Sequence, residues 1–571
     1  MNKFNKKLYS GFLLFITASI LTGGCGKFPA REFEVDKPQS LVDQEELNSY
    51  NALKTYVDYS SQPNFKLGVE LGFNDVVNNS ILYKLVPKHF DQISFTSLNH
   101  VDYVQADGKV SVESFNKALN ANEPYSMPVY AGQLVWHSQQ RAAYLNSLIA
   151  NVVLPGVSGS DVLVNFENNS IGDTYPATSS AASATIVADP DGKSGKAIRI
   201  LKVTGTAYPQ FNITLPGGRK LGYYKNIMVD FKGGTCCGYY GAGMQAAIST
   251  TLGPVTLKGY GGPSSFGIAA DQWGRGMIKL PVATLNLTDE QKELTSFVLT
   301  IGSNTGSPDY LLDNITMDWE IPGQTIIKTP EEKAVIIRGE LEKWIKAVAE
   351  AGKGRVKSWS VIYQPIDETN PSTLRSGTGI GTLPDNTFYW QDYLGKDYAA
   401  IAIAMVKQYS SADDKIFFTE TNLVDNPAKI HGLTALIEYT EAKGVKVDGI
   451  ATELALNIAS DRQKIETMLS VLAATGKLIK IASLDIGINA SKSQATDGLY
   501  KQQADMYKWF VEAYLRLIPA NKRAGITFRS PVDQSASSAW RANEPVGLWT
   551  DQFLRKKAYA AVADAFYGLH K

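Results

Sequence analysis

Residues 447–486 read VDGIATELALNIASDRQKIETMLSVLAATGKLIKIASLDI. The stretch begins with an apolar run at 449–456, continues with apolar residues at helical spacing over 462–475, and returns to an apolar run at 479–486. This order is typical of a strand, a helix and a second strand that lies parallel to the first. The stretch therefore predicts a parallel α/β fold.

The same alternation extends over most of the chain. The predicted strands are residues 65–72, 93–97, 128–138, 356–364, 415–421, 449–456, 479–486 and 525–528. The predicted helices are residues 81–89, 112–121, 331–351, 398–409, 428–443, 462–475, 500–517 and 556–567. Eight strands and eight helices predict a (β/α)8 TIM barrel. A doubly wound sheet of eight strands is the structural alternative.

The alternation stops between residues 154 and 322. This segment is rich in Gly, Ser, Thr and Tyr and carries short strand-like runs without a helical pattern. It predicts an all-β jelly-roll sandwich inserted after the third barrel strand. The barrel is then expected in two parts, residues 50–153 and 323–571, on either side of the inserted β-sandwich at 154–322.

The N-terminus has the layout of an export signal. Lys3, Lys6 and Lys7 precede an apolar run at 8–21, which is followed by Thr-Gly-Gly and Cys25. The small residues before the cysteine resemble a bacterial lipobox, whose cysteine carries the lipid, so residues 1–25 are expected to be a lipoprotein signal peptide and 26–49 a tether. This predicts lipid attachment at Cys25 in the outer membrane, with the protein exposed at the cell surface. An ordinary cleaved signal is the alternative.

Composition excludes several partners and cofactors. The 56 basic residues balance the 56 acidic ones, so no net positive charge attracts nucleic acid. The only other cysteines, Cys236 and Cys237, are adjacent, and the five histidines are scattered, which does not suggest a metal centre. We expect no required cofactor.

Four motifs at the predicted strand ends carry a family likeness: LVWHSQ at 134–139, WSVI at 359–362, VDGIAT at 447–452 and IASLDI at 481–486. Together they resemble glycoside hydrolase family 10, the endo-xylanase family, over residues 65–568. Members of that family from gut Bacteroidetes carry carbohydrate-binding modules inserted after the third strand. The resemblance implies a glycan-binding cleft formed by Trp136, His137, Gln139, Tyr363, Gln364 and Trp540.

The two catalytic positions of that family are not kept. The family hydrolyses glycosides with two glutamates, one an acid and base and one a nucleophile. The acid motif, Trp-Asp-Val-Val-Asn-Glu-Ala, reads WSVIYQP at 359–365, which places Gln364 at the proton donor. The nucleophile motif, Ile-Thr-Glu-Leu-Asp, reads IASLD at 481–485, which places Ser483 at the nucleophile. Without both carboxylates, conventional hydrolysis is not expected.

Other family positions have changed as well. Replaced positions are Thr96, Ser97, His100, Gly132, Glu453, Ala455 and Arg529, whereas Trp136, His137, Gln139 and Trp540 keep the family residue. Carboxylates lie near the motifs at Asp367, Glu368, Glu420, Glu453 and Asp485. A rewired catalytic pair such as Glu453 with Glu420 is one interpretation, and ordinary loop charges or helix caps are the other.

The insertion carries its own resemblance. Its ends, VNFE at 164–167 and YLLDNI at 310–315, resemble edge strands of carbohydrate-binding modules of families 4 and 22. This implies a candidate structural calcium held by Glu167 and Asp313, although the motif is short. Aromatic residues that could stack on sugar rings are Tyr223, Tyr224, Tyr239, Tyr240, Tyr260 and Trp273, of which many are expected to be core or surface residues.

Three functions remain open on the sequence. The first is a surface lipoprotein that binds xylan or a related β-1,4-glycan through an inactive barrel, its inserted module or both, beside a glycan transporter or neighbouring glycosidases. The second is an active glycosidase with rewired catalytic residues. The third is a scaffold for an outer-membrane uptake complex that binds no sugar.

Overall fold

The structure is a computed structural model of the chain. It describes residues 36–95, 98–179, 182–191, 195–202, 207–233, 244–255, 258–260, 268–269, 271–303 and 309–568. The predicted signal peptide with Cys25, the aligned residues Thr96 and Ser97, the adjacent Cys236 and Cys237, and the aromatic candidates Tyr239 and Tyr240 lie outside the described residues. The described chain divides into two compact units, one reaching Ile149 and resuming at Pro330, the other spanning Ala150–Thr329. The sequence placed the corresponding boundaries at 154 and 322.

Eight parallel strands of the described chain form a closed barrel. In barrel order they are β1 (Leu67–Glu70), β2 (Gln92–Phe95), β3 (Val129–Val135), β17 (Val356–Tyr363), β18 (Lys415–Glu420), β19 (Gly449–Asn457), β20 (Leu478–Gly487) and β21 (Arg523–Phe528). Because β21 pairs with β1, the sheet has no edges, and the doubly wound alternative is excluded. The fold is therefore the predicted (β/α)8 TIM barrel, with additional β-sheets in the insertion.

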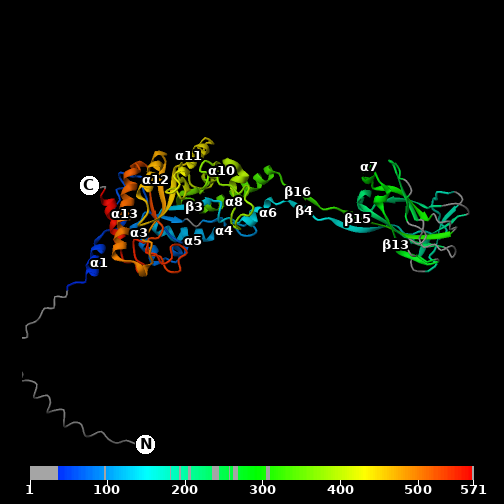
Figure 1. Cartoon of the computed structure of the whole chain (residues 1–571), viewed down its shortest axis with the longest axis horizontal. Coiled ribbons are helices and arrows are strands. Elements are labelled where there is room, and N and C mark those ends of the chain that lie inside the picture. The colour runs from blue at the N-terminus through cyan, green and yellow to red at the C-terminus, as the bar shows by residue number, and fades with distance from the viewer. Residues whose placement is uncertain are drawn as a thin grey trace, which may run out of the picture. The chain divides into compact units, whose positions relative to one another are not determined.

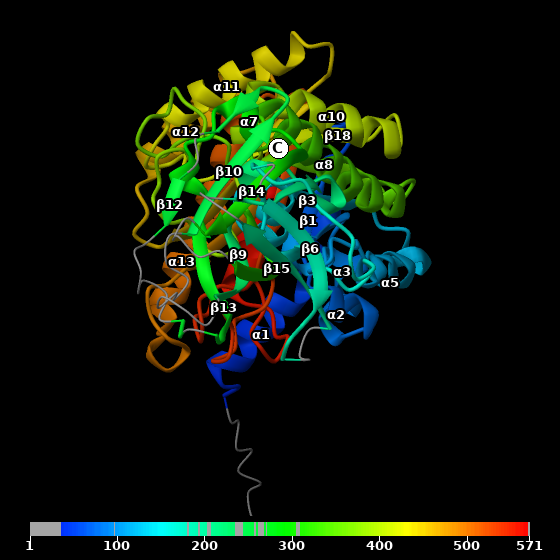
Figure 2. The same cartoon turned by 90° about the vertical axis from the view of Figure 1, so that its right-hand side faces the viewer.

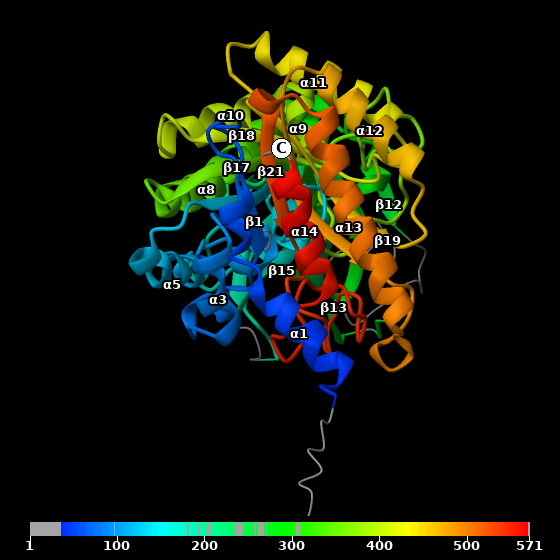
Figure 3. The same ribbon diagram turned by 90° about the vertical axis from the view of Figure 1, so that its left-hand side faces the viewer.

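Helices surround the barrel, as the blue-to-red succession in Figure 1 shows. They include α3 (Ile81–His89), α5 (Glu113–Asn122), α8 (Pro330–Gly352), α10 (Tyr398–Tyr409), α11 (Ala428–Glu441), α12 (Arg462–Ala474), α13 (Asp497–Leu517) and α14 (Lys557–Tyr567). The chain end is packed on the outside, where α13 and α14 run side by side (Figure 3). The barrel strands are covered by helices on the outer face and by one another's side chains on the inner face. Burial on both faces explains their continuous apolar runs.

Short helices after the first strands escaped the sequence prediction. They are α2 (Phe73–Val77), α4 (His100–Tyr103), α6 (Ala142–Ile149) and α9 (Trp390–Leu394). The segment predicted as a tether ends in a further helix, α1 (Gln39–Ser49), which has no buried residue and packs weakly against α14. Arg555 holds the turn after α1 by donating hydrogen bonds to the carbonyl oxygens of Leu47, Asn48 and Tyr50.

The barrel core is built around large aromatic side chains. Trp344, Trp359, Trp390 and Trp549 are each at most 1% exposed. Their indole N–H groups still need acceptors inside the protein. Trp344 donates to the carbonyl of Leu134 at 2.8 Å, which ties α8 to the end of β3 beside the cleft.

The inserted unit consists of two antiparallel sheets that enclose their own apolar core. One sheet has the order β13 (Trp273–Pro281), β9 (Tyr224–Gly233), β15 (Asp309–Ile321), β7 (Lys196–Lys202), β6 (Ala182–Ala188), with β5 (Val157–Val164) also on β15. Figure 2 shows β13, β9, β15 and β6 of this sheet. The other has the order β11 (Gly253–Pro254), β10 (Met244–Thr250), β14 (Ser296–Ser303), β8 (Gln210–Thr214), with β12 (Lys258–Tyr260) on β10. A separate two-stranded ribbon, β4 (Val152–Leu154) with β16 (Gln324–Ile326), stands at the two chain ends of this unit.

In the part of the chain that the structure describes, the helices are too short or too polar to cross a bilayer.

Candidate functional site

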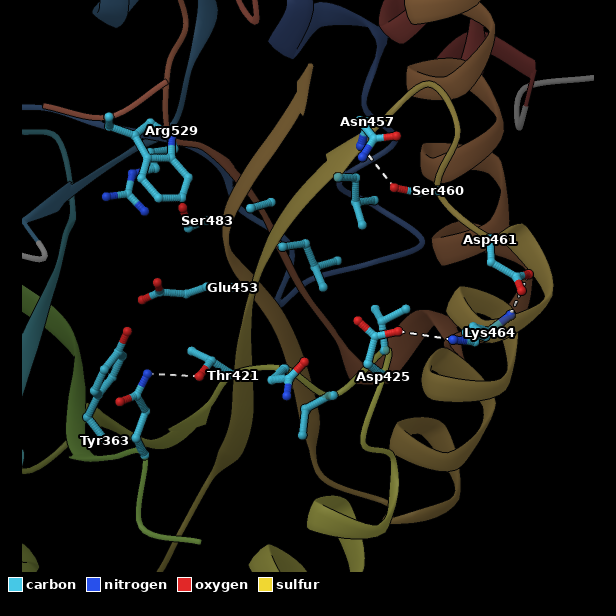
Figure 4. Close-up of a pocket in the computed structure, with 18 residues that line it drawn as sticks. Tyr363, Thr421, Asp425, Glu453, Asn457, Ser460, Asp461, Lys464, Ser483 and Arg529 are labelled. Atoms are coloured by element: carbon cyan, nitrogen blue, oxygen red, sulfur yellow. Dashed lines mark hydrogen bonds and ion pairs between the residues drawn. The ribbon is translucent and has the colours of Figure 1, made fainter. Parts of the chain in front are cut away.

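A cavity of about 590 Å³ opens at the carboxyl ends of the barrel strands, where barrels of this kind place their sites. It is lined mainly from β17, β18, β19 and the segments that follow them (Figure 4). The lining residues are Tyr363, Gln364, Thr421, Asn422, Leu423, Val424, Asp425, Glu453, Leu454, Ala455, Leu456, Asn457, Ser460, Asp461, Lys464, Ser483, Arg529 and Trp540. Seven of the residues singled out in the family comparison therefore meet here: Tyr363, Gln364, Glu453, Ala455, Ser483, Arg529 and Trp540.

Gln364 directly follows β17 and is held at both ends of its side-chain amide. Its nitrogen donates to the hydroxyl of Thr421 at 2.8 Å, and its oxygen accepts from the indole N–H of Trp136 at 3.0 Å. Its backbone has a positive φ of 50°, and its N–H donates to the carbonyl of Thr419 at 2.8 Å. A fixed carboxamide has no titratable proton to give to a leaving group.

Ser483 lies on β20 and is 3% exposed. In the parallel pairing of β19 with β20 its partner is Glu453. The position that the family alignment assigns to a nucleophile therefore carries a hydroxyl, and the carboxylate stands on the neighbouring strand. A serine needs a base to become a nucleophile, which makes Glu453 the group that decides the chemistry of the cavity.

Glu453 projects into the cavity beside Tyr363 and Arg529 (Figure 4). Burial raises the pKa of the Glu453 carboxyl above its usual range, and the positive charge of Arg529 offsets part of the rise. Hydrogen bonds to Tyr363 and Gln133 offset it further. Burial, followed by the charge and hydrogen bond of Glu453, raises the pKa of the Tyr363 hydroxyl well above its usual value, and Arg529 opposes the rise, so Tyr363 stays a hydrogen-bond donor.

Trp540 forms the wall of the cavity on the β21 side. Its indole N–H donates to the carboxylate of Asp485 at 2.6 Å, and the guanidinium of Arg529 lies over its ring, 3.8 Å from the centroid. Asp485 in turn accepts from the backbone and hydroxyl of Ser530 at 3.0 and 3.1 Å. Asp485 thus acts as a buried support that orients Trp540, and it is not among the residues that line the cavity.

The remaining predicted cleft residues lie beside this cavity and outside its lining. Trp136 contacts Tyr363 edge to face at 5.1 Å between ring centroids and reaches the cavity through Gln364. His137 stacks on Tyr389 with a centroid distance of 5.3 Å and an angle of 9°. Gln139 has a positive φ of 54°, and its carbonyl accepts from the N–H of Val101. His100, a position where the family has another residue, is 2% exposed. It accepts a hydrogen bond from the N–H of Arg141, so it is a core residue.

The environment of His137 predicts a pH effect. Burial, followed by the charges of Arg375 and Lys429, lowers the pKa of His137 to about 4. Because the unfolded chain binds a proton near pH 6.5 and the folded one does not, folded-state stability falls as pH drops from about 6.5 to about 4. We expect His137→Gln to lose less stability than the parent between pH 7 and pH 4.5 in urea unfolding. A matched His431→Gln change, at an exposed position of α11, should follow the parent, and equal losses in all three proteins would contradict this assignment.

The proposed rewired partner, Glu420, has a different role. Its side chain is fully buried, and it pairs with the buried ammonium of Lys429 at 2.8 Å. Its carboxylate also accepts from the backbone N–H groups of Ile366 and Thr421. It does not line the cavity, and it is a structural carboxylate: burial raises its pKa, and Lys429 with the two backbone N–H groups opposes the rise.

Two other carboxylates do line the cavity, at its outer part. Asp425 pairs with Lys464 at 3.1 Å, and both side chains are more than half exposed, at 70% and 55%. Asp461 caps α12 by accepting from the N–H groups of Gln463 and Lys464. Among the cavity-lining residues, Glu453 is therefore the carboxylate with a buried environment and a raised pKa.

In the inserted unit, Asp313 contacts a cation from its own chain. The guanidinium of Arg275 pairs with Asp189, with Asp230 at 3.3 Å and with Asp313 at 3.1 Å. Glu167, the other predicted calcium ligand, accepts instead from the N–H of Lys196 at 3.1 Å. The described residues contain no group of three or more His, Cys, Asp or Glu side chains arranged to hold a metal.

Trp273, one of the described candidates for stacking on sugar rings, belongs to this ionic cluster. Its indole N–H donates to Asp189 at 3.0 Å, and Arg275 lies over its ring, 4.2 Å from the centroid. Tyr224 is 2% exposed and donates to Asp161, so it is a core residue. The calcium site therefore stays a prediction. Arg275 supplies positive charge at Asp313, one of the two predicted ligands.

Metal removal tests that prediction. Because the guanidinium of Arg275 already lies against Asp313, where the predicted ion would bind, we expect EDTA to leave the thermal unfolding midpoint of the inserted unit unchanged if the arginine takes the place of that ion. Calorimetry with EDTA and with added calcium measures the midpoint. A fall with EDTA that calcium reverses would instead show a bound ion.

Sequence reasoning named Tyr363, Glu453 and Arg529 but missed Gln133 and the contacts among these residues inside the cavity. Gln133 and Tyr363 bind Glu453 from β3 and β17, and the stack of Arg529 on Trp540 joins β21 to the loop after it. The motif comparison marked Arg529 only as a replacement and paired Glu453 with Glu420. The proximity of Glu453 to the charge of Arg529 was not predicted, although the sequence shows an acidic and a basic residue at positions where the family has neither.

The comparisons with known proteins agree with this geometry. Residues 318–565 match the family described as "Glycosyl hydrolase family 10". Endo-1,4-beta-xylanase A of Cellvibrio japonicus (strain Ueda107) is 27% identical over 252 residues, which is 40% of this chain and 40% of that enzyme. The thermostable celloxylanase of Thermoclostridium stercorarium is 24% identical over 247 residues, 41% of this chain and 59% of that protein. These matches thus span well under two thirds of the relatives' own length.

A solved structure extends the likeness to the fold of the first barrel half. The crystal structure of xylanase B from Clostridium stercorarium F9 covers 90% of this chain and all of its own, with a TM-score of 0.50 and 14% sequence identity. At that identity the likeness shows the fold. Residues 318–565 are therefore similar in sequence to glycosyl hydrolase family 10, and the rest of the barrel shares the fold of these enzymes.

Proposed function

We propose that the barrel binds a β-1,4-linked plant polysaccharide of the xylan type in this cleft and does not cut it. The observation that carries the proposal is the pair of residues at the catalytic positions. Gln364 is fixed by two hydrogen bonds, and Ser483 is a buried hydroxyl. A retaining mechanism needs a proton donor and a carboxylate nucleophile about 5 to 5.5 Å apart, and neither position supplies one.

The cleft nevertheless has the groups that bind sugars. Trp540 offers an aromatic surface, Arg529 offers hydrogen-bond donors and Glu453 offers an acceptor, all on one cavity wall. A sugar hydroxyl can accept from the guanidinium and donate to the carboxylate at once, and charge-assisted bonds of this kind are stronger than neutral ones. Because Arg529 covers one face of the indole, a pyranose would pack on the part of the ring that still lines the cavity.

A second candidate function rests on Glu453 itself. A carboxyl with a raised pKa in a cavity is the usual form of a general acid. Partnered by an outer carboxylate such as Asp425, it would make the protein a glycosidase with rewired residues.

The cellular role follows from the N-terminal pattern. We propose that Cys25 carries a lipid that tethers the protein to the outer membrane, facing outward, where it holds the glycan for neighbouring glycosidases or a transporter. The support is the sequence of residues 3–25, with its lysines, apolar run and small residues before the cysteine.

The test is isothermal titration of the chain from residue 26 against xylans, glucans and mannans, with reducing-sugar release measured in the same samples. We expect a heat of binding with a β-1,4-glycan and no release. Release that is lost in Glu453→Gln, and kept in a matched Glu512→Gln variant at an exposed position of α13 outside the cavity, would overturn the proposal and establish a hydrolase with Glu453 as its acid. If no glycan binds, the protein is a scaffold and both candidate functions fail.

A further inference from the structure

A second pocket lies at the opposite end of the barrel, where the strands begin. It has a volume of about 200 Å³. Its lining comes from the first residues of β17, β18, β20 and β21 and from residues just before β1 and β3. The lining residues are Pro63, Asn64, Lys66, Gln92, Pro128, Lys357, Ser358, Asp413, Lys415, Phe417, Lys480 and Ala524. Four lysines face one aspartate, an imbalance that the neutral chain as a whole does not have.

Lys480 is the deepest of these lysines and is 1% exposed. Two residues of this lining, Phe417 and Ala524, belong to a separate apolar cluster with Tyr130, Ala451 and Ala482. The ammonium donates to the side-chain oxygen of Gln92 at 2.8 Å and lies 4.9 Å from the centroid of the Tyr130 ring. An ammonium has three hydrogens to donate, and these neutral contacts do not balance its charge.

The described residues supply no ion-pair partner for any of the four lysines, as no carboxylate in those ranges forms a salt bridge with Lys66, Lys357, Lys415 or Lys480. Asp413 is exposed at the rim. Lys415 donates to the side chain of Asn64 at 2.6 Å, and burial, opposed by Asp448 and reinforced by Lys446 and Lys66, lowers its pKa. Buried positive charge without a counter-ion is costly, and a bound anion removes the cost.

We propose that this pocket, with Lys480 at its base and Lys66, Lys357 and Lys415 around it, is a binding site for a small inorganic oxyanion of the sulfate or phosphate class. The pocket is large enough for such an ion and one or more waters, and apart from Asp413 its polar side chains carry donors: lysine ammoniums, the hydroxyl of Ser358 and the amides of Asn64 and Gln92. The site is independent of the glycan cleft, because it lies at the other end of the parallel strands.

Binding of an anion at this site is expected to be coupled to the uptake of a proton. Burial lowers the pKa of Lys480 to about 7, so at pH 8 much of this amine is neutral in the empty protein. An anion beside the nitrogen favours the charged form and raises that pKa, and binding at pH 8 therefore takes up a proton. At pH 6 the amine is already charged, and little or no uptake is expected.

The experiment is titration of inorganic sulfate, which does not itself titrate in this range, into the purified full-length protein at constant ionic strength. Buffers of different ionisation enthalpy report the proton uptake. We expect a dissociation constant below about 1 mM, uptake at pH 8 that fades at pH 6, and competition by phosphate. Lys480→Met should remove the uptake and weaken binding at least about tenfold, and Lys66→Ala at the rim should weaken it with the uptake retained.

The control is Lys508→Ala, which removes one positive charge at an exposed position of α13 and should bind as the parent does. No binding of sulfate to the parent would overturn the proposal. So would binding that Lys480→Met and Lys66→Ala leave unchanged, because the ion would then occupy another surface. If Lys480→Met fails to fold, the Lys66→Ala variant and the pH dependence of uptake in the parent decide the outcome.

Discussion

Replacing Lys429 by methionine should lower the free energy of unfolding by about 3–5 kcal/mol. The ammonium of Lys429 is fully buried and pairs with Glu420, whose side chain is also fully buried, at 2.8 Å. It pairs as well with Glu368 at 2.7 Å and donates to the carbonyl of Thr421 at 3.0 Å. Methionine fills a similar volume and leaves Glu420 as an uncompensated charge under the cleft. Urea unfolding at pH 7, followed by circular dichroism, measures the loss.

Two variants make this result specific. Lys464→Met breaks the ion pair with Asp425, in which both side chains are more than half exposed, and should cost less than about 1 kcal/mol. Combining Lys429→Met with Glu420→Gln removes the orphaned charge and should restore part of the lost stability. A Lys429→Met protein as stable as Lys464→Met would show that Glu420 is not held as a structural anion, and would reopen its candidacy as a catalytic group.

Replacing Trp540 by alanine should weaken glycan binding about 30-fold, equivalent to about 2 kcal/mol. The substitution removes the aromatic surface of the cavity wall and the ring on which Arg529 rests, 3.8 Å from its centroid. Arg529 then loses its fixed position beside Glu453. Trp540→Phe keeps a ring and loses the hydrogen bond to Asp485, so we expect a smaller loss of affinity.

The matched control is Trp509→Ala. Trp509 lies on α13, on the outside of the barrel, under the guanidinium of Arg462 at 5.0 Å. We expect its loss to leave glycan affinity within about twofold of the parent. Isothermal titration with the glycan that binds best compares the variants. Unchanged affinity in Trp540→Ala would move the binding site out of this cleft.

Much of the fold could be predicted because the barrel strands and helices have strong local patterns. The stretch around β19, α12 and β20 shows this, since apolar runs and helical spacing coincide with the observed elements to within a few residues. Short helices such as α2 and α9 were missed because a single turn or two has too few residues for a periodic pattern. α1 was missed for a different reason: it buries no residue, so it has no apolar face to detect.

The site residues could be predicted only where they lie at the ends of the barrel strands. Tyr363, Gln364, Ser483 and Trp540 could be placed together because parallel strands end at one face of a barrel. The separation of Glu420 from Glu453 could not, since both carboxylates follow apolar strand residues in the same way. What distinguishes them is Lys429, a residue on α11 whose ammonium pairs with Glu420 at the end of β18. Tertiary packing determines such a contact. The role of Arg275 beside Asp313 was hidden for the same reason.

The paired strands β4 and β16 have an evolutionary and practical consequence. Ile326 stands opposite Val152 in that ribbon, so the chain enters and leaves the inserted unit at the same place. A unit whose two ends are adjacent behaves as a cassette, which can be exchanged for another or excised without reopening the ring of strands. Joining Ile149 to Pro330 by a short glycine-serine linker should therefore yield the bare barrel as a folded protein, and the sequences of the two units can diverge independently on one chain.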